Sequence, residues 1–97
     1  KPRPTAVITC GDVRALLMLQ AAAEHGLNVP RDISITGYGD LAVRTGRSKF
    51  LTSVGVDPAV MGRRAAALVT GDPKAKPVPV LVAPELHLRG TTAEPPA

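Results

Sequence analysis

A strand, a helix and a second strand follow one another within the first 38 residues, and this succession limits most strongly what the chain can fold into. Residues 6–10 (Ala-Val-Ile-Thr-Cys) form a nearly continuous apolar run rich in β-branched side chains, which predicts a buried strand. After Gly11 and Asp12, apolar residues recur at helical spacing until Gly26, and residues 33–38 predict the next strand. Two strands joined this closely by a helix are parallel and form a right-handed βαβ unit.

The middle of the chain continues this pattern. Residues 41–50 predict a polar, basic loop, and residues 51–56 predict a third strand. Asp57 can cap the following helix, and Pro58 suits its first position, where a missing N–H group has no cost. The apolar face of that helix consists of Met61, Ala65, Leu68 and Val69. We therefore expect a second helix that flanks the sheet.

The last quarter of the chain predicts a loop, two short strands and a tail. Residues 73–79 contain three prolines and two lysines, which is typical of a surface loop. Residues 80–82 predict a short strand at or near a sheet edge, and residues 86–89 alternate as a half-buried strand does. Residues 91–97 are expected to be frayed. The predicted fold class is α/β, a parallel sheet flanked by helices, in one small and incomplete domain over residues 1–97.

Composition narrows the classes of partner. Tyr38 and Phe50 are the only aromatic residues, which argues against a surface that stacks nucleic-acid bases. The net charge of +4 is spread along the chain, so we do not expect this segment to read DNA itself. Its densest group, Arg44, Arg47 and Lys49, lies in the loop before the third strand; it is either simply solvated or contacts a phosphate or a partner.

The expected compartment follows from Cys10 and from hydropathy. A single cysteine forms no internal disulfide, which favours a reducing cytoplasm. No apolar stretch approaches the roughly 20 residues that a membrane span needs. The chain begins with Lys1, and we expect it to be a piece of a longer protein.

Small and polar residues follow each of the three parallel strands. These residues are Cys10, Gly11 and Asp12 after the first strand, Tyr38, Gly39 and Asp40 after the second, and Gly55, Val56 and Asp57 after the third. In an open parallel sheet, ligands sit outside the carboxyl ends of the strands, so this edge is a candidate ligand cleft. The alternatives are that Asp12 and Asp57 only cap helices, that Gly39 and Gly55 only form turns, and that Asp40 is a turn residue instead of a ligand contact.

No arrangement of residues predicts catalysis, a cofactor or a metal. Gly37 and Gly39 lack the third glycine and the helix of a dinucleotide-binding motif. His25, near the end of a helix, and His87, on the polar face of a late strand, have no second ligand at metal-binding spacing. Cys10 has no identifiable base, and we expect it to be a small buried apolar residue. We therefore predict a protein that is not an enzyme.

The order and spacing of these segments resemble the C-terminal region of LacI/GalR-type transcription regulators. The resemblance rests on residues 3–8, on Gly11-Asp12 before an Ala/Leu-rich helix, on residues 26–38 (Gly-Leu-Asn-Val-Pro-Arg-Asp-Ile-Ser-Ile-Thr-Gly-Tyr), on Leu51-Thr52-Ser53-Val54, on Met61-Gly62-Arg63-Arg64-Ala65 and on residues 84–92. Each piece alone is weak, but together and at these distances they are specific, and they cover nearly the whole chain.

The resemblance implies a periplasmic-binding-protein-like type I fold, in which a ligand lies between two lobes. Residues 1–97 would be the distal part of the C-terminal lobe, and the helix-turn-helix that binds operator DNA would lie upstream. A sugar, nucleoside or similar metabolite would shift the geometry of the lobes and so change DNA affinity, which requires unequal binding to two conformations. Such regulators are cytoplasmic homodimers.

The resemblance also places effector-binding positions at Gly11, Asp12, Gly39, Asp40 and Val56. Many sugar-responsive members of the family have Asn or a similar polar residue at the position of Gly11 and Asp at that of Gly39, and a polar residue at that of Val56. This wall therefore departs from an ordinary sugar site, because selectivity for hydroxyl groups needs buried polar partners. Either Asp40 substitutes for them, in which case Asp40→Ala weakens effector binding, or the ligand is of another kind.

The sequence leaves two other functions open and also predicts a dimer interface. The alternative function is a periplasmic sugar-binding protein of a transport system; a nucleotide-dependent enzyme ranks third because the chain has no phosphate loop. The predicted dimer interface consists of Leu16, Leu19 and Arg47, since Leu16, Met18 and Leu19 give the first helix more apolar surface than one sheet contact needs. The alternative is that these leucines cover a missing part of the lobe.

Overall fold

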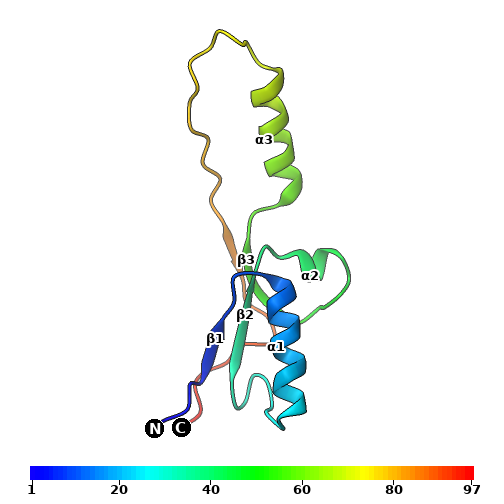
Figure 1. Cartoon of the computed structure of the whole chain (residues 1–97), viewed down its shortest axis with the longest axis vertical. Coiled ribbons are helices and arrows are strands. Elements are labelled where there is room, and N and C mark those ends of the chain that lie inside the picture. The colour runs from blue at the N-terminus through cyan, green and yellow to red at the C-terminus, as the bar shows by residue number, and fades with distance from the viewer.

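The structure, a computed structural model, describes all 97 residues and centres on one sheet of four strands. The strands are β1 (Ala6–Ile8), β2 (Ser34–Tyr38), β3 (Thr52–Gly55) and β4 (Glu85–His87), in the order β1-β2-β3-β4. The first three are parallel, and β4 runs antiparallel beside β3 (Figure 1). The α/β fold class and the first βαβ unit predicted from the sequence are thus confirmed.

Helix α1 (Asp12–Glu24) lies against one face of this sheet and forms the core with it (Figure 1). Ala15 and Ala22 are buried on the helix side, and Ile35 and Leu51 are fully buried beneath them. Alanine on the inner face lets the helix axis approach the sheet closely. Removing a side chain such as Ile35 or Leu51 from water contributes about 1.5–3 kcal/mol.

The predicted basic loop contains a short helix. Helix α2 (Leu41–Arg44) occupies one turn directly after β2, so the prediction of a loop over residues 41–50 is wrong for its first four residues. Ala42 is buried against the core, and Thr45 closes the turn through its hydroxyl, which donates to the carbonyl of Leu41 at 2.6 Å. The apolar triplet at residues 41–43 supplies the packing that a solvated loop would lack.

Helix α3 (Pro58–Thr70) projects away from the sheet instead of flanking it (Figure 1). Its cap is as predicted, because Asp57 Oδ1 accepts a hydrogen bond from the Ala59 N–H at 2.8 Å and Pro58 is the first helical residue. No residue of α3 is buried, and Val69 is 85% exposed. The expectation that α3 flanks this sheet is therefore wrong: its apolar face has nothing in this chain to pack against.

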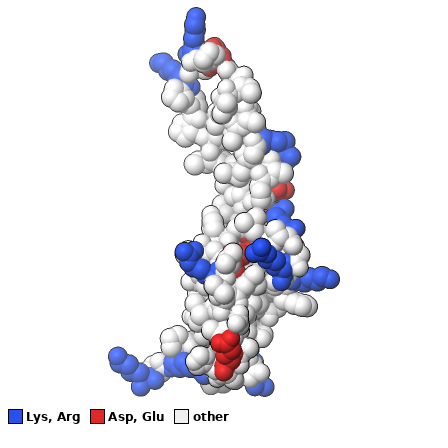
Figure 2. Space-filling view, turned by 45° about the vertical axis from the view of Figure 1, so that its right-hand side comes forward, with Lys and Arg blue, Asp and Glu red and all other residues white.

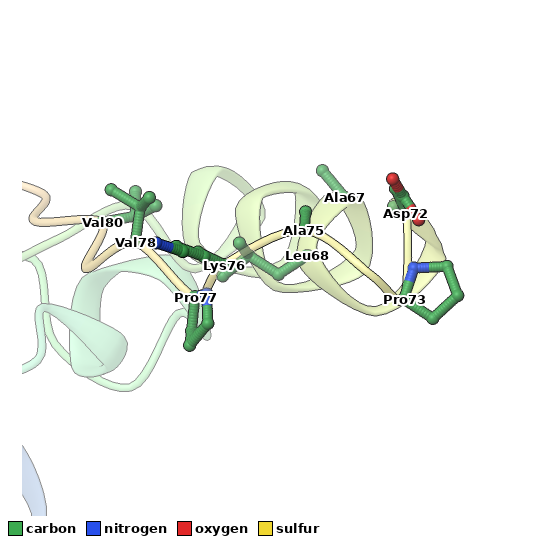
Figure 3. A pocket seen from close by; sticks show the side chains of 10 residues that line it. Ala67, Leu68, Asp72, Pro73, Ala75, Lys76, Pro77, Val78 and Val80 are labelled. Atoms are coloured by element: carbon green, nitrogen blue, oxygen red, sulfur yellow. The ribbon is translucent and has the colours of Figure 1, made fainter.

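We call α3 with residues 71–84 the arm, and the remainder of the chain the body. The molecule is 58 Å long and only 17 Å in its shortest dimension, and the arm is narrow, with basic side chains at its free end, where Lys74 and Lys76 lie (Figure 2). Residues 71–84 run back along α3 and leave a pocket of about 540 Å³ beside it. In this pocket Leu68 of the helix lies beside the returning segment that carries Ala75 and Lys76 (Figure 3).

Two predictions for the last quarter of the chain are wrong. Residues 80–82 form no strand, because the arm has no neighbouring strand with which their backbone groups could pair. Thr91 is not frayed but 5% exposed: its hydroxyl donates to the Ile35 carbonyl and accepts from the Thr52 N–H. The pairing of β2 with β3 begins at Thr36 and Thr52. Thr91 therefore bridges the two strands just before the point at which they pair with each other. Only residues 93–97 are exposed as expected.

Candidate functional site

The candidate site is the edge of the sheet at which β1, β2 and β3 end. Because the three strands are parallel, their carboxyl ends meet there, and α1, α2 and α3 all begin at this edge (Figure 1). The arm leaves the body at the same edge, directly after β3. The residues predicted to line a cleft are therefore brought together, at the junction of body and arm.

Asp12 is a structural link between three elements. It is 5% exposed; its Oδ2 accepts from the Ala42 N–H at 2.8 Å, and its Oδ1 accepts from the Ser53 hydroxyl at 2.7 Å. The residue that precedes α1 is Gly11, which caps the helix with no side-chain bond. The alternative that Asp12 caps α1 is wrong, because its side chain faces the sheet and bonds to α2 and β3. Gly37 makes room for it, since a Cβ there would collide with this carboxylate.

Ser53 connects the buried carboxylate of Asp12 to the backbone of Asp40, and sequence reasoning missed it. Its hydroxyl donates to Asp12 and accepts from the Asp40 N–H at 3.1 Å. It is fully buried on the face of β3 that α1 covers. A polar residue at an inward-facing position of a strand was the available signal, because such a side chain needs buried partners.

Asp40 is the centre of an ionic cluster. It is 4% exposed and lies at φ 55°, in the left-handed region, at the start of α2. Arg89 Nη1 donates to its Oδ1 at 2.7 Å, while Arg44 Nε and His87 Nε2 lie 3.7 Å and 3.6 Å from its Oδ2. Arg89 also donates to the carbonyl of Leu51 at 2.7 Å, so it fastens the C-terminal segment to the edge. Arg89 was quoted in the family motif, but no role was predicted for it.

Two opposing effects set the pKa of Asp40. Burial raises the pKa of this carboxyl group, because it disfavours the charged form. The hydrogen bond and charge of Arg89, with the charges of His87 and Arg44, outweigh burial and hold the pKa below its usual value of 3.8. Asp40 is thus a carboxylate that is already paired within the chain.

The other predicted effector positions offer no polar side chain. Gly39 lies at φ 105°, and a Cβ on Gly55 would come within 2.8 Å of the Gly39 carbonyl carbon, so the two backbones approach closely. Gly11 is extended, and Arg14 Nη1 lies 3.7 Å from the place of a Cβ there. Val56 is half-buried. The wall is therefore built from backbone, small residues and one apolar side chain.

A pocket of about 280 Å³ lies where the arm joins the body. It is lined by Arg44, Gly55, Val56, Asp57, Val60, Val82, Ala83, Glu85 and His87. Both chain segments that connect body and arm contribute to it, one after β3 and one before β4. Of the four pockets, this is the one lined by residues predicted at this edge. The largest lies wholly in the arm, and the other two are lined by residues 88–93 and by residues of β1, β2 and the C-terminal segment.

The isolated histidines and the cysteine have the following surroundings. His25 Nδ1 lies 2.9 Å from the Ala21 carbonyl at the end of α1. His87 contacts Asp40 and Glu85. Cys10 is exposed, and the prediction that it is buried is wrong, because it follows the last residue of an edge strand. No group of three His, Cys, Asp or Glu side chains is arranged so that it could hold a metal ion.

Comparison with known proteins identifies the family. Residues 1–92 match the family described as the periplasmic binding protein-like domain. The arabinose metabolism transcriptional repressor of Geobacillus stearothermophilus is 33% identical over 95% of this chain, and the HTH-type transcriptional repressor PurR of Pasteurella multocida is 42% identical over 68% of it. A LacI transcriptional regulator from a Rhodococcus species superposes on 99% of the chain with a TM-score of 0.82 and 33% identity. The chain belongs to the LacI family.

This LacI-family chain is short relative to the proteins it resembles. It spans 26% of the arabinose repressor, 20% of the repressor PurR and 36% of the Rhodococcus structure. Its relatives are transcription regulators with a periplasmic-binding-protein-like domain. None of its helices is long and apolar enough to cross a membrane.

Of the residues predicted as a dimer interface, Leu16 and Leu19 pack against the border of the core, and Arg47 lies in the loop after α2. Leu16 and Leu19 are half-buried, and Arg47 is exposed. Val13 and Leu17, which were not predicted, are more exposed than these leucines, at 60% and 61%. Helix α1 of this LacI-family chain thus presents an apolar strip beyond its contact with the sheet.

Proposed function

We propose that this chain is the distal part of the C-terminal lobe of a LacI-type transcription regulator, and that it senses a small metabolite which alters operator binding. The observation that carries the proposal is the position of the sheet edge. The carboxyl ends of three parallel strands meet at the junction of body and arm, where a pocket lies. A ligand held between two lobes would contact this edge.

The shape of the chain supports a two-lobe domain. The body has its own core, whereas α3 has none, and its apolar side chains are exposed. A helix with such a face is stable when the face is covered. We assign the arm to the second lobe, with the connections at residues 56–57 and 82–84 as crossings between the lobes.

The side chains at this edge restrict which chemical groups of an effector the wall can bind. Asp12 and Asp40 are saturated by partners within the chain, and Gly11 and Gly39 carry no side chain. On this wall, the effector therefore meets backbone groups, Val56 and the pocket residues instead of free carboxylates. Gly11, Asp12, Gly39, Asp40 and Val56 remain the proposed effector-binding positions, with the two aspartates acting through the backbone that they hold.

The proposed function also assigns partners and a compartment to the full-length regulator. The full-length regulator binds operator DNA through an upstream helix-turn-helix domain and works as a homodimer in the cytoplasm. Leu16, Leu19 and Arg47 are the proposed dimer contacts of this segment. We assign no enzymatic activity and no cofactor to it.

A gel-shift titration of the full-length regulator on the DNA upstream of its own gene tests the function. A panel of sugars, nucleosides and polyols is added, and we expect one metabolite to abolish or strengthen the shift. If the protein gives no shift at low salt but keeps tight metabolite binding, it is a transport or binding protein, the alternative function.

The Gly11→Phe variant tests the site itself. Gly11 is extended, so any residue can adopt its backbone conformation, and the nearest atom to a Cβ there is at 3.7 Å. A phenyl ring should block the cleft, so we expect normal DNA binding with no response to the metabolite. His25→Phe, at the opposite end of α1, is the matched control and should respond normally. A normal response of Gly11→Phe would remove this edge from the effector site.

A further inference from the structure

Three charged residues, Arg44, Asp40 and Asp57, connect the body to the start of the arm. Arg44, at the end of α2, has Nε at 3.7 Å from Asp40 Oδ2 and Nη1 at 3.7 Å from Asp57 Oδ1. Asp40 belongs to the body, and Asp57 is the cap of α3 in the arm. One guanidinium group therefore spans the connection that follows β3.

Both carboxylates that Arg44 approaches are fixed in place. Asp40 is held by Arg89 at 2.7 Å, and Asp57 Oδ1 accepts from the Ala59 N–H in the first turn of α3. Because each acceptor is tied to a rigid element, their separation depends on the orientation of α3 relative to the sheet. Arg44 contacts both only within a limited range of that orientation.

The chain segment that returns from the arm, residues 82–84, ends beside the ionic cluster around Asp40. His87, in β4, has Nε2 at 3.6 Å from Asp40 Oδ2 and at 3.8 Å from Glu85 Oε2. Glu85 and His87 lie directly after residues 82–84, which return from the arm, and they line the same pocket as Arg44. The ionic cluster thus borders both connections, and the pocket of about 280 Å³ between them leaves space for movement.

We propose that Arg44, Asp40 and Asp57 form an ionic latch that favours one orientation of the arm relative to the body. The inference rests on the proposed function for its consequence, because the orientation of the arm would be the angle between the lobes. The side chain of Arg44 is 37% exposed and that of Asp57 is 46% exposed. Partly exposed ion pairs contribute little to stability, so losing the latch shifts the balance of orientations a few-fold without unfolding the domain.

Distance measurements in the full-length regulator test the latch. Spin labels are placed at Arg31→Cys in the body and Lys74→Cys in the arm, in a Cys10→Ser background. Labelled protein is diluted with unlabelled protein, so that pulsed electron resonance reads distances within one chain. Arg44→Gln removes the bridging charge, and Asp57→Asn removes the acceptor charge while Asn still caps α3. We expect both variants to broaden or shift the distance distribution in the same way, and the double variant to add nothing further.

Lys49→Gln is the matched control, because Lys49 is an exposed cation in the loop that follows α2 and has no ionic partner. Its distribution should equal that of the unsubstituted protein, and about 1 M NaCl should reproduce the effect of Arg44→Gln by screening. The latch is overturned if Arg44→Gln matches the control, or if Arg44→Gln acts and Asp57→Asn does not. The distances are read without DNA or effector, so failure of the gel-shift experiment leaves this test independent.

Discussion

Two buried carboxylates, Asp12 and Asp40, organise the carboxyl edge of the sheet at the scale of single residues. A buried charge is costly unless it is paired and hydrogen-bonded. Asp12 meets this requirement with a backbone N–H and a hydroxyl, and Asp40 meets it with Arg89, Arg44 and His87. Because these partners lie in α2, β3, β4 and the C-terminal segment, each carboxylate links parts of the chain that are far apart in sequence.

Arg89→Ala should destabilise the body strongly. The substitution removes the closest partner of Asp40 and a donor to the Leu51 carbonyl. Breaking a buried pair by removing one member costs about 3 kcal/mol or more. We expect a clear fall in the urea midpoint of the full-length regulator, followed by circular dichroism. Lys49→Ala, at an exposed position in the loop after α2, should leave it unchanged, and equal midpoints for the two variants would contradict the role given to Arg89.

The stability contributed by Asp40 should depend on pH. Its pKa in the folded state is below the usual 3.8, so the unfolded chain binds a proton more readily. The contribution is therefore fully present above the unfolded pKa and is lost as pH falls through the folded pKa. Urea midpoints measured between about pH 5 and pH 2 should fall more steeply for the unsubstituted protein than for Asp40→Asn. Parallel curves would show that Asp40 contributes nothing to acid sensitivity.

Gly55→Ala should be far more harmful than Gly62→Ala. A Cβ at Gly55 would lie 2.8 Å from the carbonyl carbon and 2.9 Å from the carbonyl oxygen of Gly39, both backbone atoms that have to shift. A Cβ at Gly62, inside α3, meets nothing within 4 Å, and Ala in a helix interior is favoured over Gly by about 1 kcal/mol. Thermal melting of the two variants should show a loss for the first and no loss for the second; similar melting temperatures would refute the close approach of β3 to the Gly39 turn.

At the scale of elements, Asp12 ties α1 to α2 and β3. Replacing it with Ala leaves the Ala42 N–H without its partner and removes the acceptor of the buried Ser53 hydroxyl. A buried polar group left unsatisfied costs about 1–3 kcal/mol. In Asp12→Ala, we expect the Ala42 amide to exchange its hydrogen much faster, as read by mass spectrometry. Asp57→Ala loses the cap of α3 and the charge that faces Arg44, but it keeps the Asp12 partner of the Ala42 amide, which should stay protected.

The elements themselves followed from periodicity, whereas their contacts did not. The strands at residues 34–38 and 52–55 and the helix at residues 12–24 repeat the apolar spacings that predicted them. Helix α2 and the role of Ser53 depend on which side chains meet across the sheet, and this information is tertiary. For the same reason the aspartate at position 12 was open to interpretation as a cap: local spacing identifies a helix start, but not the direction in which a side chain finds its partner.

The candidate site was predicted in its location and only partly in its residues. Parallel strands bring their carboxyl ends to one edge, so the sequence was sufficient to place Gly11, Gly39 and Val56 there. It was not sufficient to show that Asp40 is already paired, because Arg89 is 49 residues away along the chain. The direction of α3 was also not predictable, since its amphipathic pattern indicates an apolar contact without saying what the contact is.

At the scale of the whole molecule, two apolar surfaces have no cover within the chain. The first is the apolar face of α3, and the second is the sheet face opposite α1, where Ile8 is 85% exposed and Leu86 is 59% exposed. Leu86 pairs with Val54, and Ile8 with Thr36, on the face away from the buried Ile35. Exposed apolar side chains that share one face of an element are typical of an interface. In the proposed two-lobe domain, other parts of the regulator cover both surfaces.

Hydrogen exchange compared between two proteins tests this cover. In the 97-residue chain alone, the amides of α3 should exchange within seconds, because a 13-residue helix without tertiary packing is marginal in water. In the full-length regulator, the same amides should be protected, whereas those of the exposed segment at residues 72–77 should exchange rapidly in both. Leu68→Asp should abolish the protection in the full-length protein, because it would place a charge in the covered face. Lys74→Asp, at an exposed position in the same arm, should not. If the amides of α3 exchange equally fast in both proteins, the arm is not covered by a second lobe and the two-lobe assignment fails.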